Sequence, residues 1–325
     1  MKSNKKYLYF LAIAIVIIVW GLDPILMDGF YKMYSPSILG AICTLTSAIV
    51  FLPILIRGRS KIDKTFLKIT MPIFLMNGLA VAIQRIGLKF TTPSSYTFLE
   101  HLCCVSVPLT VFVLTRRPPK KFEILAIITC LAGCVIFLGD GFSGGFNIGD
   151  VLCAIAGLLL GVATAATGIY ASKIDSGLFM ASYMWVAGIV SAISALVLGT
   201  VQLNGEPIET PMFNSEPLNI ITIVLFGIIS TGICWLMRTI AIKHLSAIDV
   251  AIVSPLSAVI TGVVSVTMGL EKVTFNLVIG GVIILAAAFM SLFDDMVPGK
   301  KPKINELETD ATHSSCENEK VEAHA

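Results

Sequence analysis

Ten long apolar segments fill this chain of 325 residues, and each is long enough to cross a lipid bilayer as a helix. A helix rises 1.5 Å per residue, so about 20 apolar residues span a hydrocarbon core about 30 Å thick. Hydrophobic residues make up 56% of the chain and charged residues only 14%, which excludes an ordinary soluble domain. The sequence therefore predicts an all-α membrane protein whose spans are Tyr7–Met27, Pro36–Ile56, Lys68–Phe90, Pro93–Thr115, Lys121–Gly139, Asp150–Ser172, Gly177–Val201, Pro217–Ile242, Ala247–Gly269 and Thr274–Asp294.

The orientation of the spans follows from the loops, because cytoplasmic loops carry an excess of Lys and Arg. The opposite side has few basic residues and includes an acidic loop with Glu206, Glu209 and Glu216. Because the number of spans is even, the two termini also share one side. We expect a multi-pass protein of the cell membrane with both termini in the cytoplasm. The basic residues that define the cytoplasmic side are Lys2, Lys5, Lys6, Arg57, Arg59, Lys61, Lys64, Arg116, Arg117, Lys120, Lys121, Lys173, Lys243 and the cluster Lys300–Lys303.

The chain divides into two halves at the glycine-rich stretch Gly139–Gly149. Placing Lys89 on Lys243 matches the ends of the third and eighth spans and sets His101 opposite Pro255 without a gap. Since five is an odd number of spans, the second half enters the membrane in the opposite orientation, which is typical of secondary transporters. The predicted parts are an N-terminus 1–6, a first repeat 7–139, a linker 140–149, a second repeat 150–294 and a disordered cytoplasmic tail 295–325.

Short motifs occur along both halves of the chain. They are Trp20-Gly21, Gly87-Leu-Lys-Phe-Thr-Thr92, Val107-Pro108-Leu109, Arg116-Arg117-Pro118, Gly149-Asp150, Ser254-Pro255, Glu271 and Gly280-Gly281. In their order and spacing these motifs resemble the drug/metabolite transporter superfamily, EamA type, over residues 7–294. The resemblance implies ten helices in two inverted five-helix repeats around a central cavity. It also implies the movement of small metabolites, with cargo and direction left open.

Asp23, Arg85, Glu100 and His101 depart from that family pattern, and charged residues within the membrane normally face a cavity or a partner. By their distance from the span ends, Asp23, Arg85 and Glu100 share the outer third of the membrane. We expect Glu100 to bind a cation or carry a proton, with a structural Arg85–Glu100 pair as the alternative. Asp23 is a second acidic candidate, and Pro24 could open the helix beside it. The alternatives for Asp23 are an ion pair with Arg85 or a position near the interface with ordinary access to water.

Aromatic side chains lie one helical turn from both acids, Trp20 beside Asp23 and Tyr96 beside Glu100. Aromatic faces attract ammonium groups, so these residues could form a partial cage for a cation. Bundle packing is the alternative for Tyr96. His101 points about 100° away from Glu100 and is a weaker candidate.

Other polar residues within the spans have alternative roles. Ser254, Ser257 and Thr261 form a hydroxyl stripe that could line the pathway or serve close packing. Gly157 and Gly161 form a helix-contact motif. Arg238 is expected to snorkel toward the cytoplasm or to pair locally.

These residues predict a secondary transporter of a small polar metabolite, such as an amine or another cation, with protons as one coupling ion. Export of amino acids or other neutral metabolites is the alternative. An intramembrane enzyme or a channel is remote, because no hydrolase motif, phosphate-binding loop or selectivity filter is readable. Seven of the eight cysteines lie in apolar segments, and we expect no disulfide, metal or cofactor. The expected partners are the bilayer and a small molecule, with no nucleic acid; the sequence leaves the oligomeric state open.

Overall fold

The computed structural model describes the chain apart from a set of short gaps and the C-terminal region. The expected linker 140–149 and tail 295–325 therefore lie almost entirely outside the described residues. Residues Met1–Ser291 form one compact unit, and only the end of one helix is described in the unit Leu292–Ala325. The residues that are not described are 1, 117, 120, 138–146, 171–174, 201, 204–205, 208, 210–211, 246, 271 and 297–325.

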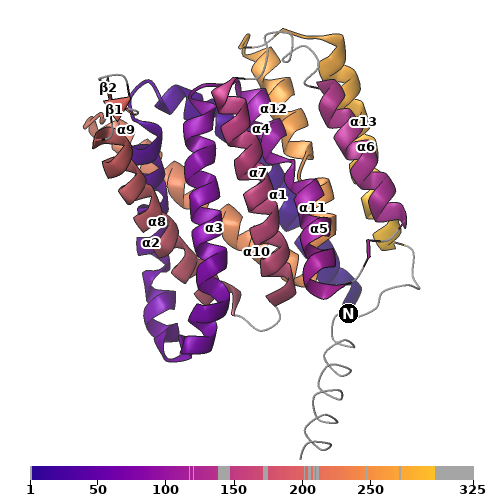
Figure 1. The fold of residues 1–325 in the computed structure, drawn as a ribbon, viewed down its shortest axis with the longest axis horizontal. Coiled ribbons are helices and arrows are strands. Elements are labelled where there is room, and N and C mark those ends of the chain that lie inside the picture. Colours follow the sequence, from indigo (N-terminus) through magenta and orange to yellow (C-terminus); the bar gives the residue numbers. More distant parts are fainter. Residues whose placement is uncertain are drawn as a thin grey trace, which may run out of the picture. The chain divides into compact units, whose positions relative to one another are not determined.

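Helices account for nearly all regular structure in the described residues (Figure 1). A short ladder, β1 (Gln202–Leu203) with β2 (Glu206–Pro207), is the exception to the all-α prediction. Helix starts follow familiar signals: Asp63 accepts a hydrogen bond from Phe66 N at 2.6 Å, and Pro93 opens its helix after Thr92. The helices are α1 (Lys2–Phe30), α2 (Pro36–Gly58), η1 (Arg59–Lys61), α3 (Lys64–Leu88), α4 (Pro93–Glu100), α5 (Cys103–Thr115), α6 (Lys121–Phe137), α7 (Ile148–Tyr170), α8 (Ser176–Thr200), α9 (Pro217–Phe226), η4 (Gly227–Ile233), α10 (Cys234–His244), α11 (Ala247–Val253), α12 (Leu256–Thr267) and α13 (Phe275–Met296).

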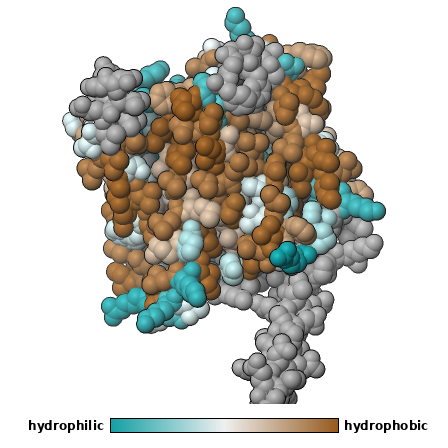
Figure 2. Space-filling model, viewed as in Figure 1, coloured by the Kyte–Doolittle hydropathy of each residue, from teal (hydrophilic) through white to brown (hydrophobic). Residues whose placement is uncertain are grey.

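Eight helical segments in the described part of the chain are long and apolar enough to cross a membrane. A ninth apolar helix, Phe275–Ala287, is shorter. Figure 2 shows that the visible face is mainly hydrophobic between the ends of the helices. The chain is therefore a multi-pass membrane protein, and the full count of ten spans stays a prediction. The eight segments are Tyr7–Phe30, Pro36–Lys61, Lys64–Leu88, Pro93–Thr115, Ile148–Tyr170, Ser176–Thr200, Pro217–His244 and Ala247–Thr267.

The structure corrects two local expectations. Pro24 does not open α1, which runs unbroken from Lys2 to Phe30. The predicted fourth and ninth spans are each broken instead. The first breaks between α4 and α5 at His101-Leu102, and the second between α11 and α12 at Ser254-Pro255.

The packing within the compact unit pairs helices from the two sequence halves. Helix α2 packs along α8, and α3 packs along α7. Helix α1 contacts α10 and α12, while α4 contacts α12 and α5 contacts α11. The broken spans therefore pack against each other on both sides of their breaks. This arrangement brings α1, α3, α4 and the η4–α10 region around one polar cavity.

Candidate functional site: a polar cavity between α1, α3, α4 and η4

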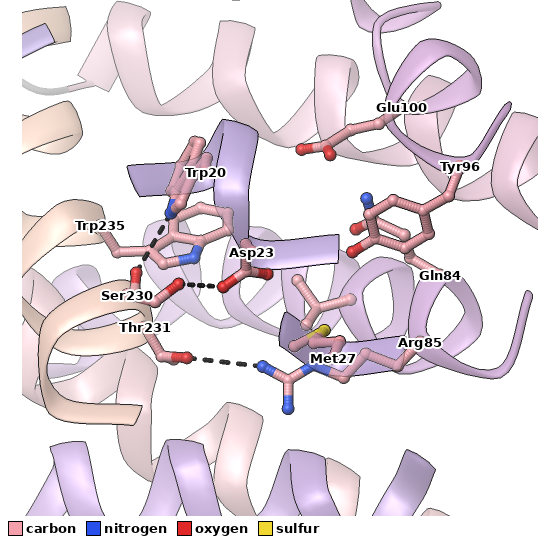
Figure 3. Close-up of a pocket in the computed structure, with 11 residues that line it drawn as sticks. Trp20, Asp23, Met27, Gln84, Arg85, Tyr96, Glu100, Ser230, Thr231 and Trp235 are labelled. Carbon is pink, nitrogen blue, oxygen red and sulfur yellow. Dashed lines mark hydrogen bonds between the residues drawn. The ribbon is translucent and has the colours of Figure 1, made fainter. Parts of the chain in front are cut away.

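The cavity collects most of the charged residues singled out from the sequence (Figure 3). It measures about 40 Å³. That volume suits a few water molecules and is far below the roughly 300–1,000 Å³ of sites for larger ligands. Its lining residues are Trp20, Asp23, Met27, Val81, Gln84, Arg85, Tyr96, Glu100, Ser230, Thr231 and Trp235.

Asp23 projects from α1 toward the η4 turn. Its carboxylate accepts a hydrogen bond from the hydroxyl of Ser230. Trp20, one turn earlier, donates its indole N–H to the carbonyl of Ser230 at 3.1 Å. Both side chains of α1 therefore bind one residue of the eighth span, and Asp23 remains partly exposed to the cavity.

The η4 turn is a π-helix, in which backbone hydrogen bonds join residues five apart, as Cys234 N–H to Ile229 O does. Side chains from neighbouring helices also donate to two carbonyl groups of this turn. Ser47 Oγ donates to Gly227 O at 2.9 Å, and Trp20 donates to Ser230 O. The π-helix also directs the hydroxyls of Ser230 and Thr231 into the cavity, so it builds one wall of the site.

Arg85 lies buried on the wall opposite Glu100, with 4% of its surface exposed. One guanidinium amine donates to Thr231 Oγ1 at 3.5 Å, and the other, Nη1, has no hydrogen-bond partner in the described structure. Among the contacts of described residues, none is an ion pair between Arg85 and Asp23 or Glu100. The direct Arg85–Glu100 pair therefore stays a hypothesis, although both residues line the same cavity.

Glu100 ends α4 and is partly exposed to the cavity. Tyr96, one turn earlier, and Gln84 of α3 lie beside it (Figure 3). The carbonyl oxygens of Leu99 and Glu100 are close to Gly157 of α7, where any side chain would collide with them. Gly157 thus lets α7 pack against the helix break that presents Glu100.

The sequence predicts that Arg238 snorkels toward the cytoplasm or pairs locally; the structure buries it inside the bundle, where it has a nearby partner. It is 8% exposed and donates to Thr164 Oγ1 at 2.8 Å. Its guanidinium carbon lies 5.7 Å from the ring of Trp20 and 5.4 Å from that of Trp235. The two indole faces and the hydroxyl hold a buried cation next to the cavity.

His101 and the hydroxyl stripe lie outside the cavity lining. His101 Nε2 is 2.8 Å from Ser257 Oγ, which links the two helix breaks. Thr261 Oγ1 donates to Gly21 O at 2.7 Å and lies 3.3 Å from Thr97 Oγ1. Ser254 Oγ donates to Val250 O in its own helix. In this conformation, His101, Ser257 and Thr261 join helices and Ser254 bonds within its own span, and none of the four lines the space around Glu100.

Sequence reasoning missed Gln84, Ser230 and Thr231, and it found no partner for Trp235. The sequence did contain a pattern that could have indicated Ser230, Thr231 and the nearby Trp235. Gly227 and Gly232 flank Ser230-Thr231 in an otherwise apolar span. A π-helix depends on packing with other helices, so its position could not be read from that pattern alone. In the described chain, no group of three or more His, Cys, Asp or Glu side chains is arranged to hold a metal ion.

Comparison with known proteins gives a consistent relationship along the chain. Residues 7–139 and 147–293 both match the EamA-like transporter family. Two proteins of Archaeoglobus fulgidus, each described as an uncharacterized transporter, are similar. One is 22% identical over 281 residues, covering 86% of this chain and 84% of the relative. The other is 25% identical over 218 residues, covering 66% of this chain and 71% of the relative.

A solved crystal structure of a protein of unstated function shares the fold. The TM-score is 0.66 at 18% identity, and the match covers 88% of this chain and 96% of the other. At that identity the likeness concerns the fold alone.

Proposed function

Because the chain belongs to the EamA-like transporter family, we propose that it is a secondary active transporter of a small polar metabolite in the cell membrane. Its termini lie in the cytoplasm, as the loop charges indicate. We propose ten spans in two inverted repeats, 7–139 and 150–294. Two separate family matches, one in each half, support this division.

The helix breaks support the inverted repeat. When Lys89 is placed on Lys243, Glu100 falls on Ser254 and His101 on Pro255. The breaks in the fourth and ninth spans thus occupy positions that agree to within one residue. Discontinuous helices near the repeat interface are common where transporters bind their cargo.

Two glycine contacts support the same symmetry. A side chain at Gly161 would collide with Cys103 and Ser106. A side chain at Gly21 would collide with Ser257 and Ile260, which the same alignment places on Cys103 and Ser106. The first and sixth spans therefore approach the broken helices in equivalent ways.

We infer the class of cargo from the two carboxylates that line the cavity, Asp23 and Glu100. Both are partly exposed and lie with the indoles of Trp20 and Trp235 around one space (Figure 3). Acidic groups beside aromatic faces suit an amine or another small cation. A proton can occupy the same carboxylate, so exchange of cation for proton follows directly from this chemistry.

One observation favours a second candidate, export of amino acids or other neutral metabolites. Arg85 lines the same cavity, and its Nη2 donates to Thr231 Oγ1 over a long distance of 3.5 Å. A guanidinium held by so long a hydrogen bond suits a carboxylate or another acceptor on the cargo. A molecule that carries both charges would use Arg85 together with Glu100.

Binding of either cargo requires the helices to separate, because about 40 Å³ is too small for a metabolite. In the conformation of the structure, the cavity is therefore too small to hold the cargo. Opening to one side and then the other is the alternating access expected of inverted repeats.

The test begins with a thermal-shift screen of amines, amino acids and sugars on the purified protein. A ligand at 100 times its dissociation constant should stabilise the fold by about 2.7 kcal/mol. The best amine is then used for uptake into proteoliposomes by wild type and Glu100→Gln across a pH series. Glu100→Gln should fold and lose uptake, and wild-type uptake should fall once acid protonates the carboxylate.

Two further results separate the candidates. Asn219→Gln, a change of a partly exposed residue in α9 outside the cavity, should leave uptake unchanged. Arg85→Gln should abolish uptake of an amino acid and spare that of a simple amine. Equal rates and pH profiles for wild type and Glu100→Gln would exclude Glu100 from the mechanism.

A further inference from the structure

A second and larger hollow lies between α3, α5 and α7, and its volume is about 800 Å³. Helix α7 forms its floor with Ala163, which is fully buried. Pro72 of α3 and Val113 of α5 form its exposed walls. None of the residues that line this groove lines the polar cavity, so the groove is a separate site.

The groove is apolar along its length and basic at one end. Lys68, Thr110 and Tyr170 are its polar lining residues. Lys68 lies one turn into α3, and Tyr170 is the last residue of α7. Since α3 begins at Lys64 and α7 ends at Tyr170, both polar residues lie at the same end of the bundle. By the loop charges, this is the cytoplasmic end.

The length of the groove matches one leaflet. From Lys68 to Met76 the helix rises about 12 Å, whereas one leaflet of a 30 Å hydrocarbon core is about 15 Å thick. A concave apolar surface at this depth is open to acyl chains. At the interface, Lys68 extends its ammonium group to the level of the phosphates, and Tyr170 is suited to the same level.

We propose that this groove binds an anionic phospholipid of the inner leaflet, with an acyl chain between α3 and α5 and the phosphate at Lys68. Basic residues at the cytoplasmic end of a groove between membrane helices are suited to anionic head groups. The apolar walls supply the contact area for the acyl chain, and Lys68 supplies the preference for a negatively charged head group. The inference rests on the membrane location and is independent of the cargo.

The experiment uses the delipidated full-length protein in detergent. Dioleoyl phosphatidylglycerol and dioleoyl phosphatidylcholine are titrated separately, and the unfolding temperature and the lipid-bound mass in native mass spectrometry are recorded. Wild type should be stabilised more by phosphatidylglycerol. Lys68→Gln should weaken its binding about fivefold and remove the preference, since one interfacial cation near anionic lipid contributes about 1 kcal/mol.

Matched variants test the two parts of the site. Lys89→Gln changes an exposed lysine at the other end of α3 and should behave as wild type. Val113→Trp fills the mouth of the groove and should weaken both lipids, whereas Val197→Trp on exposed α8 surface should weaken neither. The proposal is wrong if Lys68→Gln keeps the preference or if both tryptophan variants behave alike. It is also wrong if Val113→Trp only dissociates a dimer, because the groove would then bind a second copy.

Discussion

The carboxylate of Asp23 in α1 accepts a hydrogen bond from the hydroxyl of Ser230, which lies 207 residues later in the π-helical turn η4. The carbonyl of the same Ser230 accepts the indole N–H of Trp20. One residue of the second half therefore fixes an acid and an aromatic ring of the first half. A cation that binds Asp23 in the cavity contacts the junction of the two halves, so its binding can bias their relative arrangement.

Ser230→Ala should destabilise the protein by about 1.5–3 kcal/mol, because a charged acceptor within the membrane loses its donor. Ser230→Thr should restore most of the loss, since the hydroxyl is retained. Thermal unfolding in detergent measures both. Thr222→Ala is the matched control, because that exposed hydroxyl donates only to Leu218 O of its own helix. Equal losses for Ser230→Ala and Thr222→Ala would show that the Asp23 contact is weak.

The contact of Arg238 with two indoles yields a second prediction. Trp235→Phe should retain part of the interaction with the cation, whereas Trp235→Leu should remove it. The difference in unfolding free energy between these variants should be about 0.5–2 kcal/mol. In an Arg238→Gln background that difference should vanish, which double-mutant analysis of unfolding midpoints can measure. A difference that persists without Arg238 would reflect ring packing alone.

The structure brings together three charged residues that the sequence placed at one level. Counting residues from the span ends put Asp23, Arg85 and Glu100 at similar depths, and they line one cavity. Counting was sufficient for this because helix rise is constant and α4 contacts both α1 and α3, whereas the depth of these residues in a membrane stays a prediction. The contributions of Ser230, Thr231 and Trp235 depend on contact between the two halves, which no local pattern encodes.

The helix breaks show a second limit of sequence reasoning. In the sequence, both broken spans are continuous apolar segments that predict unbroken helices. Pro24 was the position at which the sequence predicted that a helix could open. Helix α1 nevertheless continues through Pro24, while the fourth span breaks at His101-Leu102 before Pro108 is reached. At this break, Gly157 of α7 gives the carbonyl groups of Leu99 and Glu100 room, since a side chain there would collide with them. That contact is tertiary, so composition could not predict it.

The orientation in the membrane is a third prediction, motivated by the loop charges. A thiol introduced at Asn204 should react with a membrane-impermeant reagent from outside intact cells, and one at Lys61 should not. The seven described cysteines are buried, and Cys316→Ser removes the remaining thiol from the background. Lys61 should become reactive after the cells are permeabilised. The reverse labelling pattern would invert the proposed topology.

The last prediction concerns the contact between the two broken helices. His101 Nε2 and Ser257 Oγ are 2.8 Å apart, and both side chains are buried, with 4% of each exposed. His101 Nδ1 has no hydrogen-bond partner in the described structure, so the Ser257 contact is the polar interaction that its ring retains. Ser257→Ala should therefore cost about 1–3 kcal/mol, the penalty for leaving a buried polar group unsatisfied.

A double-mutant cycle separates this contact from ordinary packing. His101→Ala, Ser257→Ala and the double variant are unfolded in the same detergent, and the coupling free energy should be about 0.5–1.5 kcal/mol. Ser265→Ala, also buried in α12, serves as the control partner and should show no coupling with His101. If the His101–Ser257 coupling is absent, the two breaks are held together by backbone packing. If the coupling is present, the His101–Ser257 hydrogen bond restrains the fourth span of one half against the ninth span of the other. Any motion that exposes Glu100 to either side must then break this bond or move both spans together.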